Sequence, residues 1–490
     1  MTDAGSRWAR REDLALLTDL YELTMLNGYW RRGRERVGAS FEYFFRDLPP
    51  HTGFAVTAGL EQLLEFVENL RFNDDDLAYL ATLSMFDREF LAFLRTFRPT
   101  VSIDAAPEGT VVFPYEPVVR IEGPLAEAQF LETAVLNALN YPTLVATKTA
   151  RIRLAANSDR VMEFGLRRAQ GPDGGLSGSR AAYIGGADAT SNVLAGKLFG
   201  IPVAGTHAHS WVMAFEDELT AFRTYAELYP ESCVLLVDTY DTLASGLPNA
   251  LTVFRELRES RPGVRAAVRL DSGDLARLSK AAYAMFTQAG FSDPLIVASN
   301  ELDEDLIADL KRQNAPINAW GVGTHLITSS SWPALGGVYK LTAMREADVW
   351  EPRIKLSSNP AKMTDPGRKR VVRYRDAEGR PVGDILYRAD EEPHGGPLVS
   401  YVGRAELGFQ MGLGGVAAFE DLLTPVMRGG RRLAPPAPIA AARQRAVEQV
   451  ASLPEELRRL RNPEIYHVGI SSELAALKAD LIRHSPGVLR

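Results

Sequence analysis

The chain has 490 residues, more than one ordinary hydrophobic core supports, so two or three domains are expected. Its formal net charge is −7, from 55 Lys and Arg against 62 Asp and Glu, which argues against nucleic acid as the main partner. No secretory apolar segment and no apolar run of transmembrane length occurs, so we expect neither export nor a membrane span. The single cysteine, Cys233, lies in an apolar run, and a chain without disulfides is expected to be cytoplasmic.

The first third of the chain reads as an α+β domain over residues 1–145. Residues 14–30 place apolar side chains at helical spacing and predict a first helix. The elements expected after it are a strand at 39–49, helices at 58–70 and about 84–97, short β segments at 110–113 and 117–122, and helices at 124–139 and 142–156.

A series of apolar runs follows, each rising to a polar or glycine-rich tip. The five clearest cover residues 201–210, 233–241, 264–274, 294–303 and 318–330. Their starts are about thirty residues apart, which leaves room for one strand and one helix each, as in a parallel sheet buried on both faces. Strands near Arg160 and within 181–200 bring the expected number to about seven, enough for an irregular α/β barrel. We place this catalytic domain at residues 146–345.

Two further segments complete the chain. Residues 346–432 contain Glu-Gly and Pro turns between apolar stretches and predict β-hairpins that complete the N-terminal domain. A Pro-rich linker at 433–440 then leads into a helical segment, residues 433–490, with helices expected around 438–452 and 471–484.

The tips of the apolar runs carry the side chains with chemical potential. In parallel sheets, ligands bind beyond the carboxyl ends of the strands, so side chains at these tips are expected to meet. The residues concerned are His207, His209, Asp238, Arg269, Asp271, Asp274, Asn300 and Thr324. Together they indicate an enzyme that handles a phosphorylated sugar.

The string VRLDSGDL at 268–275 delivers Arg269 at the end of a strand and two carboxylates just after it. Asp271 and Asp274 suit ribose hydroxyls or a hydrated Mg²⁺, which prefers oxygen ligands. The alternative is that Asp271 only caps the next helix, since Asp is favoured there without any ligand.

Gly321 and Gly323, and then Gly336 and Gly337, allow backbone N–H groups to approach a phosphate. Glycines are also common in ordinary turns. Four lysines in or near the following loop could add positive charge, or could simply be solvated. They are Lys340, Lys355, Lys362 and Lys369.

A neutral histidine at a strand tip can act as a nucleophile, a base or a metal ligand. His207 and His209 are two apart on an extended segment and would point to opposite faces, which makes a shared metal ion an unfavoured reading. Phe164 precedes Arg167 and Arg168 at the first barrel strand, and a ring beside a guanidinium can hold a flat anionic ring. Asp188, in GGADATSN, fits an N-cap as well as a ligand.

These strings occur together in one family. The chain resembles nicotinate phosphoribosyltransferase over nearly its full length, from LLTDLYELTMLNGYW at 16–30 to NPAKMTDPGRK at 359–369. EFGLRRAQGPDGG, GGADATSNVLAGKLFGIPVAGTHAHS, VRLDSGDL, SNELDE, GVGT and LGGVYKL lie between them in the family's order. The resemblance implies transfer of phosphoribose from phosphoribosyl pyrophosphate to nicotinate, giving nicotinate mononucleotide and pyrophosphate with ATP hydrolysis. It also implies Mg²⁺, ATP as co-substrate, and a homodimer with shared active sites.

The resemblance further implies roles for matched residues. His209 corresponds to the histidine that ATP phosphorylates, and the motif match, not the chemistry, selects it over His207. Two aromatic residues, Tyr21 of the other subunit and Phe164, would sandwich the pyridine ring. The remaining expected roles are nicotinate binding by Thr206 and Arg269, contact with phosphate or carboxylate by Arg167, ribose binding by Asp271, a place near the base for Asp188, substrate binding by Asn300, and the 5′-phosphate cup at Gly323 and Thr324.

Three other readings compete with this one. Nicotinamide phosphoribosyltransferase shares the architecture, although the Arg-rich 163–172 segment favours the acid over the amide. A barrel isomerase or aldolase also places phosphates beyond late strands, but the five tips present no Schiff-base lysine. A catalytically inactive scaffold would release no pyrophosphate with any pyridine substrate.

Overall fold

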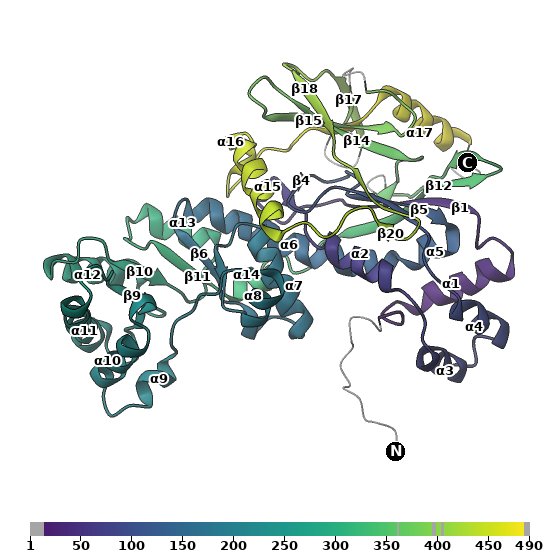
Figure 1. Cartoon of the computed structure of the whole chain (residues 1–490). Helices are drawn as coiled ribbons and strands as arrows, with labels where there is room; N and C mark the ends of the chain where they lie inside the picture. Colours follow the sequence, from purple (N-terminus) through teal and green to yellow (C-terminus); the bar gives the residue numbers. More distant parts are fainter. Residues whose placement is uncertain (1–13, 360–361, 394–397, 403–405, 485–490) are drawn as a thin grey trace. The chain divides into compact units, whose positions relative to one another are not determined.

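The computed structural model describes residues 14–359, 362–393, 398–402 and 406–484, and its chain divides into two compact units (Figure 1). Unit 1 comprises Met1–Thr143 and Ala334–Arg490, and unit 2 comprises Leu144–Pro333. No helix among the described residues has both the length and the apolar character needed to cross a bilayer.

Unit 1 is built on an antiparallel sheet with the strand order β13-β12-β1-β5-β3-β19-β20. Its central strand β1 is buried at seven of its eight residues, because both of its edges are paired and both of its faces are covered. The strands are β1 (Gly38–Phe45), β3 (Ser102–Ala105), β5 (Val119–Pro124), β12 (Gly337–Glu346), β13 (Val349–Pro352), β19 (Thr424–Arg428) and β20 (Arg431–Arg432).

A second sheet in unit 1 has the order β17-β16-β21-β15-β14-β18. Its strands are β14 (Lys369–Arg375), β15 (Pro381–Arg388), β16 (Leu398–Val402), β17 (Glu406–Met411), β18 (Ala418–Asp421) and β21 (Val468–Ile470). A short pair, β2 (Ala55–Val56) and β4 (Val111–Val112), lies apart from both. The expected hairpins of residues 346–432 are therefore present, and β21 of the last segment pairs with two of their strands.

The helices of unit 1 follow the apolar periodicity of the sequence. They are α1 (Leu20–Arg31), α2 (Leu60–Asn69), α3 (Asp74–Thr82), α4 (Arg88–Arg95), α5 (Leu125–Phe130), α15 (Ile439–Ser452), α16 (Glu455–Arg458) and α17 (Ser472–His484). Helix α6 (Glu132–Ala156) begins in unit 1 and continues through Pro142 into unit 2, where two helices were expected. A proline removes one backbone hydrogen bond from a helix. The residues that follow Pro142 in α6 are buried, and this packing offsets the loss.

Unit 2 holds a parallel sheet with the order β7-β6-β11-β10-β9-β8. Its strands are β6 (Arg160–Glu163), β7 (Ala189–Thr190), β8 (Leu235–Leu236), β9 (Ala267–Leu270), β10 (Leu295–Ala298) and β11 (Ala319–Val322). The run at 201–210 forms only an isolated parallel bridge, from Val203 to Thr190. Six strands and one bridge thus stand where a seven-stranded barrel was expected. A mixed α/β fold with a parallel sheet is what the structure contains.

Helices alternate with these strands, and several begin where Asn or Asp accepts a hydrogen bond from the first turn. Asn192, Asp217, Asp274 and Asp303 cap α8, α10, α12 and α13 in this way. The helices are α7 (Gly171–Ile184), α8 (Val193–Phe199), α9 (His209–Met213), α10 (Glu218–Leu228), α11 (Leu247–Ser260), α12 (Leu275–Gln288), α13 (Glu304–Arg312) and α14 (Thr324–Ile327), with short turns η1 (Leu166–Arg168), η2 (Pro230–Ser232) and η3 (Thr242–Gly246).

The unit boundaries differ from the expected domain limits of 145 and 345. Strand β12 follows the last strand of unit 2 in the chain, yet it pairs with β1, about three hundred residues earlier, over its whole length. The sequence LGGVYKL, expected at the end of the catalytic domain, therefore lies wholly in unit 1. Strand pairing decides the boundary here, and pairing partners so distant in sequence leave no local signal.

A buried ion pair in unit 1 removes one of the four lysines from consideration as a phosphate ligand. The Lys369 ammonium lies 2.8 Å from the Glu42 carboxylate, and both side chains are almost wholly buried. Lys369 Nζ also donates to the carbonyls of Asp365 and Gly367. Its charge is thus neutralised within the fold, and removing one partner would leave the other buried and unpaired.

The close packing of α7 on α6 gives a test of the unit 2 fold. A Cβ at Gly185, the C-terminal cap of α7, would lie 2.2 Å from the Ala146 carbonyl oxygen, whereas a Cβ at Gly174 meets only Gln170 Cβ, at 3.8 Å. We expect Gly185→Ala to lower the free energy of unfolding by about 1–3 kcal/mol through overpacking. Gly174→Ala, the control in the same helix, should leave it unchanged or raise it by about 0.5–1 kcal/mol. Equal denaturation midpoints for the two variants would contradict the packing.

Candidate active site

The candidate site lies at the carboxyl edge of the unit 2 sheet, where Arg269 is the last residue but one of the buried strand β9. Its guanidinium donates from Nε to Ser299 Oγ, from Nη1 to Thr206 Oγ1 and from Nη2 to Asp271 Oδ1, each at 2.8 Å. Ser299 also donates to Asp271 Oδ1, so the three acceptors form one network. Arg269 is 9% exposed, so its charge is held in a largely dry position by partners from three different loops.

Among the described residues, hydrogen bonds are recorded for three of the five N–H groups of Arg269. A guanidinium carries five donors, and the three hydrogen bonds of the network use one each. The remaining donors, in a fixed planar group, suit a carboxylate or phosphate oxygen. The network therefore prepares the arginine for an anion.

Phe164 lies beside this arginine, with its ring centre 5.9 Å from Arg269 Cζ. Phe164 follows β6, and its ring covers Gly321 of β11, where a Cβ would come within 2.6 Å of two ring carbons. Glycine at 321 leaves the space that the ring occupies. The sequence predicted an arginine next to Phe164, but placed Arg167 and Arg168 in that role; both lie exposed on η1, and the arginine near the ring is Arg269.

Glu163, which the sequence reasoning passed over, fixes the turn that carries Phe164. The carboxylate is fully buried and accepts from Ser179 Oγ at 2.8 Å, from Thr190 Oγ1 at 2.5 Å and from the Gly165 backbone N–H. It thus joins β6, α7 and β7. An acidic residue inside an apolar strand was the available signal, since a buried carboxylate needs several donors.

His207 and His209 have different environments, as their spacing predicted. His209 begins α9, is two-fifths exposed, and its Nε2 lies 3.2 Å from Asp238 Oδ1. Asp238 is nearly buried and also accepts from the Asp271 N–H and the Ser272 hydroxyl. With Nε2–H donating to Asp238, the Nδ1 lone pair of His209 is left as the nucleophilic atom.

Asp238 is a residue that the sequence placed at a strand tip without giving it a role. It links His209 to the turn that follows β9, so one carboxylate orders both the histidine and the loop that carries Asp271. The signal available in the sequence was its position at the end of CVLLVDTYD, which is also where a structural capping residue would stand.

His207 is a structural group. Its Nε2 accepts from the Leu236 N–H of β8 at 3.1 Å, and its Nδ1–H faces the Ala208 carbonyl at 3.3 Å. Burial, together with the nearby charges of Arg269 and His209, lowers the pKa of His207 to about 4. The imidazole is therefore neutral, as its acceptor role at Nε2 requires.

The other expected site residues are spread more widely. Asn300 is exposed after β10 with φ of 84°, and Thr324 follows Gly323 at the start of α14. Asp274 caps α12, so of the two aspartates in DSGD it is Asp274 that has the capping role and Asp271 that faces Arg269. Asp188 lies before β7, at the amino edge, where it pairs with Arg153 at 3.0 Å and accepts from the Val161 N–H.

Tyr21 belongs to unit 1 and is the second residue of α1. Its side chain is partly exposed, and burial with the nearby carboxylates of Glu132, Glu22 and Asp19 raises its pKa to about 12. The phenol is thus neutral at physiological pH.

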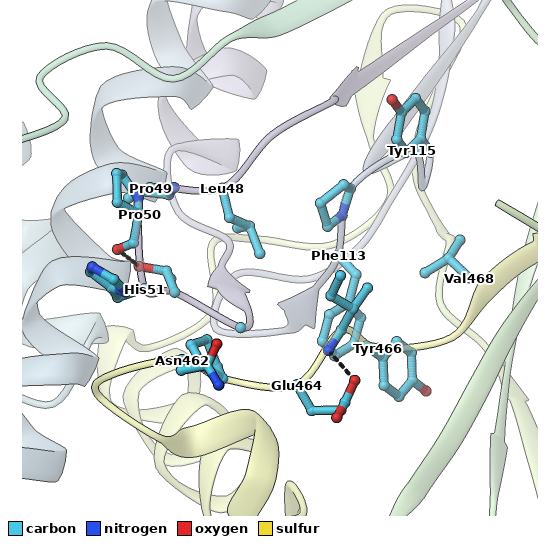
Figure 2. A pocket seen from close by; sticks show the side chains of 15 residues that line it. Leu48, Pro49, Pro50, His51, Phe113, Tyr115, Asn462, Glu464, Tyr466 and Val468 are labelled. Atoms are coloured by element: carbon cyan, nitrogen blue, oxygen red, sulfur yellow. Dashed lines mark hydrogen bonds between the residues drawn. The ribbon is translucent and has the colours of Figure 1, made fainter. Parts of the chain in front are cut away.

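A cavity of about 300 Å³ in unit 1 contains none of the expected site residues (Figure 2). It lies between residues 48–53, the Phe113–Tyr115 segment and residues 462–468, where Phe113 and Tyr466 stack with centroids 3.7 Å apart. Among the described residues, no group of three or more His, Cys, Asp or Glu side chains is arranged to hold a metal ion.

Three sequence profiles match the chain. They are the nicotinate phosphoribosyltransferase N-terminal domain over residues 16–140, the nicotinate phosphoribosyltransferase family over 160–369, and its C-terminal domain over 368–478. Among curated proteins, nicotinate phosphoribosyltransferase of Bacillus subtilis is 44% identical over 470 residues, covering 94% of each chain. The Homo sapiens protein of that name is 38% identical, covering 96% of this chain and 97% of its own.

Solved structures agree with the sequence matches. The crystal structure of human nicotinic acid phosphoribosyltransferase superposes with a TM-score of 0.80 at 37% identity, covering 95% of this chain and 99% of that one. A nicotinate-nucleotide pyrophosphorylase structure from Pyrococcus furiosus gives a TM-score of 0.70 at 23% identity, covering 92% and 99%, which shows a shared fold.

The buried neutral state of His207 predicts a pH dependence of stability. The unfolded chain binds a proton at His207 below a pKa of about 6.5, whereas the folded chain does so only near 4. The free energy of unfolding is therefore at its full value, as far as His207 is concerned, above about pH 6.5. It falls by up to about 3 kcal/mol as the pH falls toward 4. His207→Gln keeps an acceptor near the Nε2 position but does not titrate. We expect its Tm to fall less steeply with decreasing pH than that of the wild type over this range. Parallel curves would show that His207 does not titrate in this way.

Proposed function

The chain belongs to the nicotinate phosphoribosyltransferase family, and from this membership we propose that it transfers the phosphoribosyl group of phosphoribosyl pyrophosphate to nicotinate. The products are nicotinate mononucleotide and pyrophosphate, a step of NAD salvage. The observation that carries the proposal is the arginine network at the carboxyl edge of the sheet, which holds the Arg269 guanidinium beside the Phe164 ring.

Nicotinate is a flat ring with a carboxylate, and the proposed site offers a partner for each part. The Phe164 ring and the partly exposed Tyr21 of a second subunit would cover the two faces of the pyridine. Arg269 and Thr206 would bind the carboxylate, with Arg167 as a further cation for carboxylate or phosphate. The ring nitrogen is already nucleophilic, so these contacts serve to orient it toward the anomeric carbon.

The sugar phosphate would lie along the neighbouring loops. Asp271 accepts hydroxyl hydrogen bonds from the ribose, Asn300 borders the same edge, and the loop at Gly323 and Thr324 holds the 5′-phosphate. Asp188 forms an ion pair with Arg153 at the amino edge. Its expected place near the base stays a proposal from the family resemblance. Mg²⁺, for which the described residues offer no cluster of carboxylates, would enter bound to the substrate's pyrophosphate and neutralise its charge.

ATP coupling would proceed through His209 in a ligase-type reaction. The Nδ1 lone pair attacks the γ-phosphorus of ATP, the N–P bond forms, and the bond to the leaving ADP oxygen breaks. Asp238 accepts the Nε2–H, which holds the imidazole in place and stabilises the positive charge that develops on it. The phosphorylated histidine then adds charge beside the substrate site and biases the neighbouring loop toward the state that binds phosphoribosyl pyrophosphate tightly.

We also propose that the unit 2 sheet closes into an irregular barrel. Val203 bridges to β7 at one end of the sheet, and the two histidines that follow it contact β8 and Asp238 at the other. Side-chain contacts thus span the gap where strand pairing is absent. The functional protein would be a homodimer, because the proposed pyridine site includes Tyr21 of a partner. We also propose that it is cytoplasmic, as expected for a chain with a single cysteine.

The substrate assignment is tested by steady-state kinetics with both bases. The purified protein should release pyrophosphate from phosphoribosyl pyrophosphate with nicotinate, and kcat/KM should be much lower with nicotinamide. Arg269→Gln should lower kcat/KM for nicotinate at least about 100-fold, because a charge-assisted pair is lost, and lower that for nicotinamide far less. Equal losses for the two bases, in a variant with an unchanged circular dichroism spectrum, would remove Arg269 from carboxylate recognition.

The role of His209 is tested by His209→Ala. Basal, ATP-independent transfer should survive in this variant, and the stimulation by ATP should disappear along with acid-labile phosphate on the protein. Asp238→Asn should retain part of the stimulation at a reduced rate. Stimulation of His209→Ala by ATP would exclude the phosphohistidine.

A further inference from the structure

The loop proposed to hold the 5′-phosphate already binds an anionic group in this structure. Glu301 lies in the loop after β10, and its Oε2 is 3.1 Å from His325 Nε2. Its other oxygen accepts from the Thr324 hydroxyl at 3.4 Å. A carboxylate from the neighbouring loop therefore occupies the donors of the two residues that directly follow Gly323.

The donors are arranged by a third side chain. The Ser330 hydroxyl faces His325 Nδ1, and when it donates there, the imidazole carries its proton on Nε2, directed at Glu301. The Ser330 N–H also donates to the His325 carbonyl at 3.1 Å, so the loop folds back on itself. His325 is less than one-third exposed, and its orientation is fixed by both neighbours.

Glu301, in contrast, is held weakly. Its side chain is 61% exposed, and a solvent-exposed pair of this kind contributes little to stability. Asn300 and Glu301 both have left-handed backbone, with φ of 84° and 31°, which a glutamate adopts only at an energetic cost. The exposed carboxylate can therefore leave its position at little cost.

We propose that the Glu301 carboxylate stands in for the substrate phosphate when the site is empty, and that His325 is a phosphate ligand once the carboxylate has been displaced. This deepens the proposed function and rests on it for the identity of the substrate. A phosphate monoester presents the same type of acceptor oxygens to the Thr324 hydroxyl and the His325 N–H. The two anions cannot share these donors, because like charges at this distance repel.

Glu301 thus weakens phosphate binding and His325 strengthens it, which gives the two residues opposite effects. A carboxylate that merely positions the loop would instead strengthen binding. Removal of its charge therefore separates the two roles.

The experiment is calorimetric titration of the full chain with phosphoribosyl pyrophosphate and, separately, with inorganic phosphate. Glu301→Gln should lower the Kd for both probes by about 3- to 10-fold. His325→Ala should raise both by about 5- to 10-fold, with KM for nicotinate unchanged. Asp293→Asn, which removes the same charge from an exposed loop before β10, is the matched control and should stay within about twofold of the wild type.

Weaker binding by Glu301→Gln, or binding equal to that of the wild type, would overturn the proposal, as would unchanged phosphate affinity in His325→Ala. Failure of the proposed function gives a different result: the wild type would release no pyrophosphate with nicotinate. The titrations with inorganic phosphate would still decide whether Glu301 occupies an anion site, because they do not depend on the pyridine substrate.

Discussion

The arrangement of unit 2 depends on a buried guanidinium at the end of one short strand. Arg269 has partners from the loops after Val203, β9 and β10, so three connections that are separate in sequence must come to one point. A buried charge without these partners would be strongly destabilising, and this cost ties the folding of the loops to the position of the arginine. Among the described residues these bonds engage three of its five N–H groups, so the group that orders the edge is also well placed to receive an anion.

Carboxylates organise the positions around this arginine. Glu163 holds the turn of Phe164, Asp238 joins His209 to the loop after β9, and Glu301 contacts the loop after β11. The first is wholly buried, the second nearly so, and the third mostly exposed. This gradient separates their roles, because a buried carboxylate with several donors is costly to move, whereas an exposed one exchanges its partners easily.

Unit 1 shows the same use of buried charge for a different purpose. Lys369 and Glu42 pair across β1 and β14, and Arg373 pairs with Asp384 between β14 and β15, both within the interior. The first pair links the two antiparallel sheets at the start of β14, and the second joins neighbouring strands of one sheet. Lys369 is consequently structural, and counting positive charge in the sequence overstates the number of lysines available to phosphates.

The sequence by itself determined the βα rhythm of unit 2, the hairpins and several of the helices of unit 1, and the positions of Phe164, Arg269 and Thr324 at or after the strand ends, but it missed α3 and divided α6 in two. Apolar runs of strand length and aspartate caps encode these features locally, and parallel strands necessarily bring their carboxyl ends together. Only the tertiary structure decided that 201–210 forms a single bridge, that β12 returns to β1, and that Arg269 is the arginine beside Phe164. Those outcomes depend on which distant segments pair and which charges are buried together, and the free energy of such contacts is set by the whole fold.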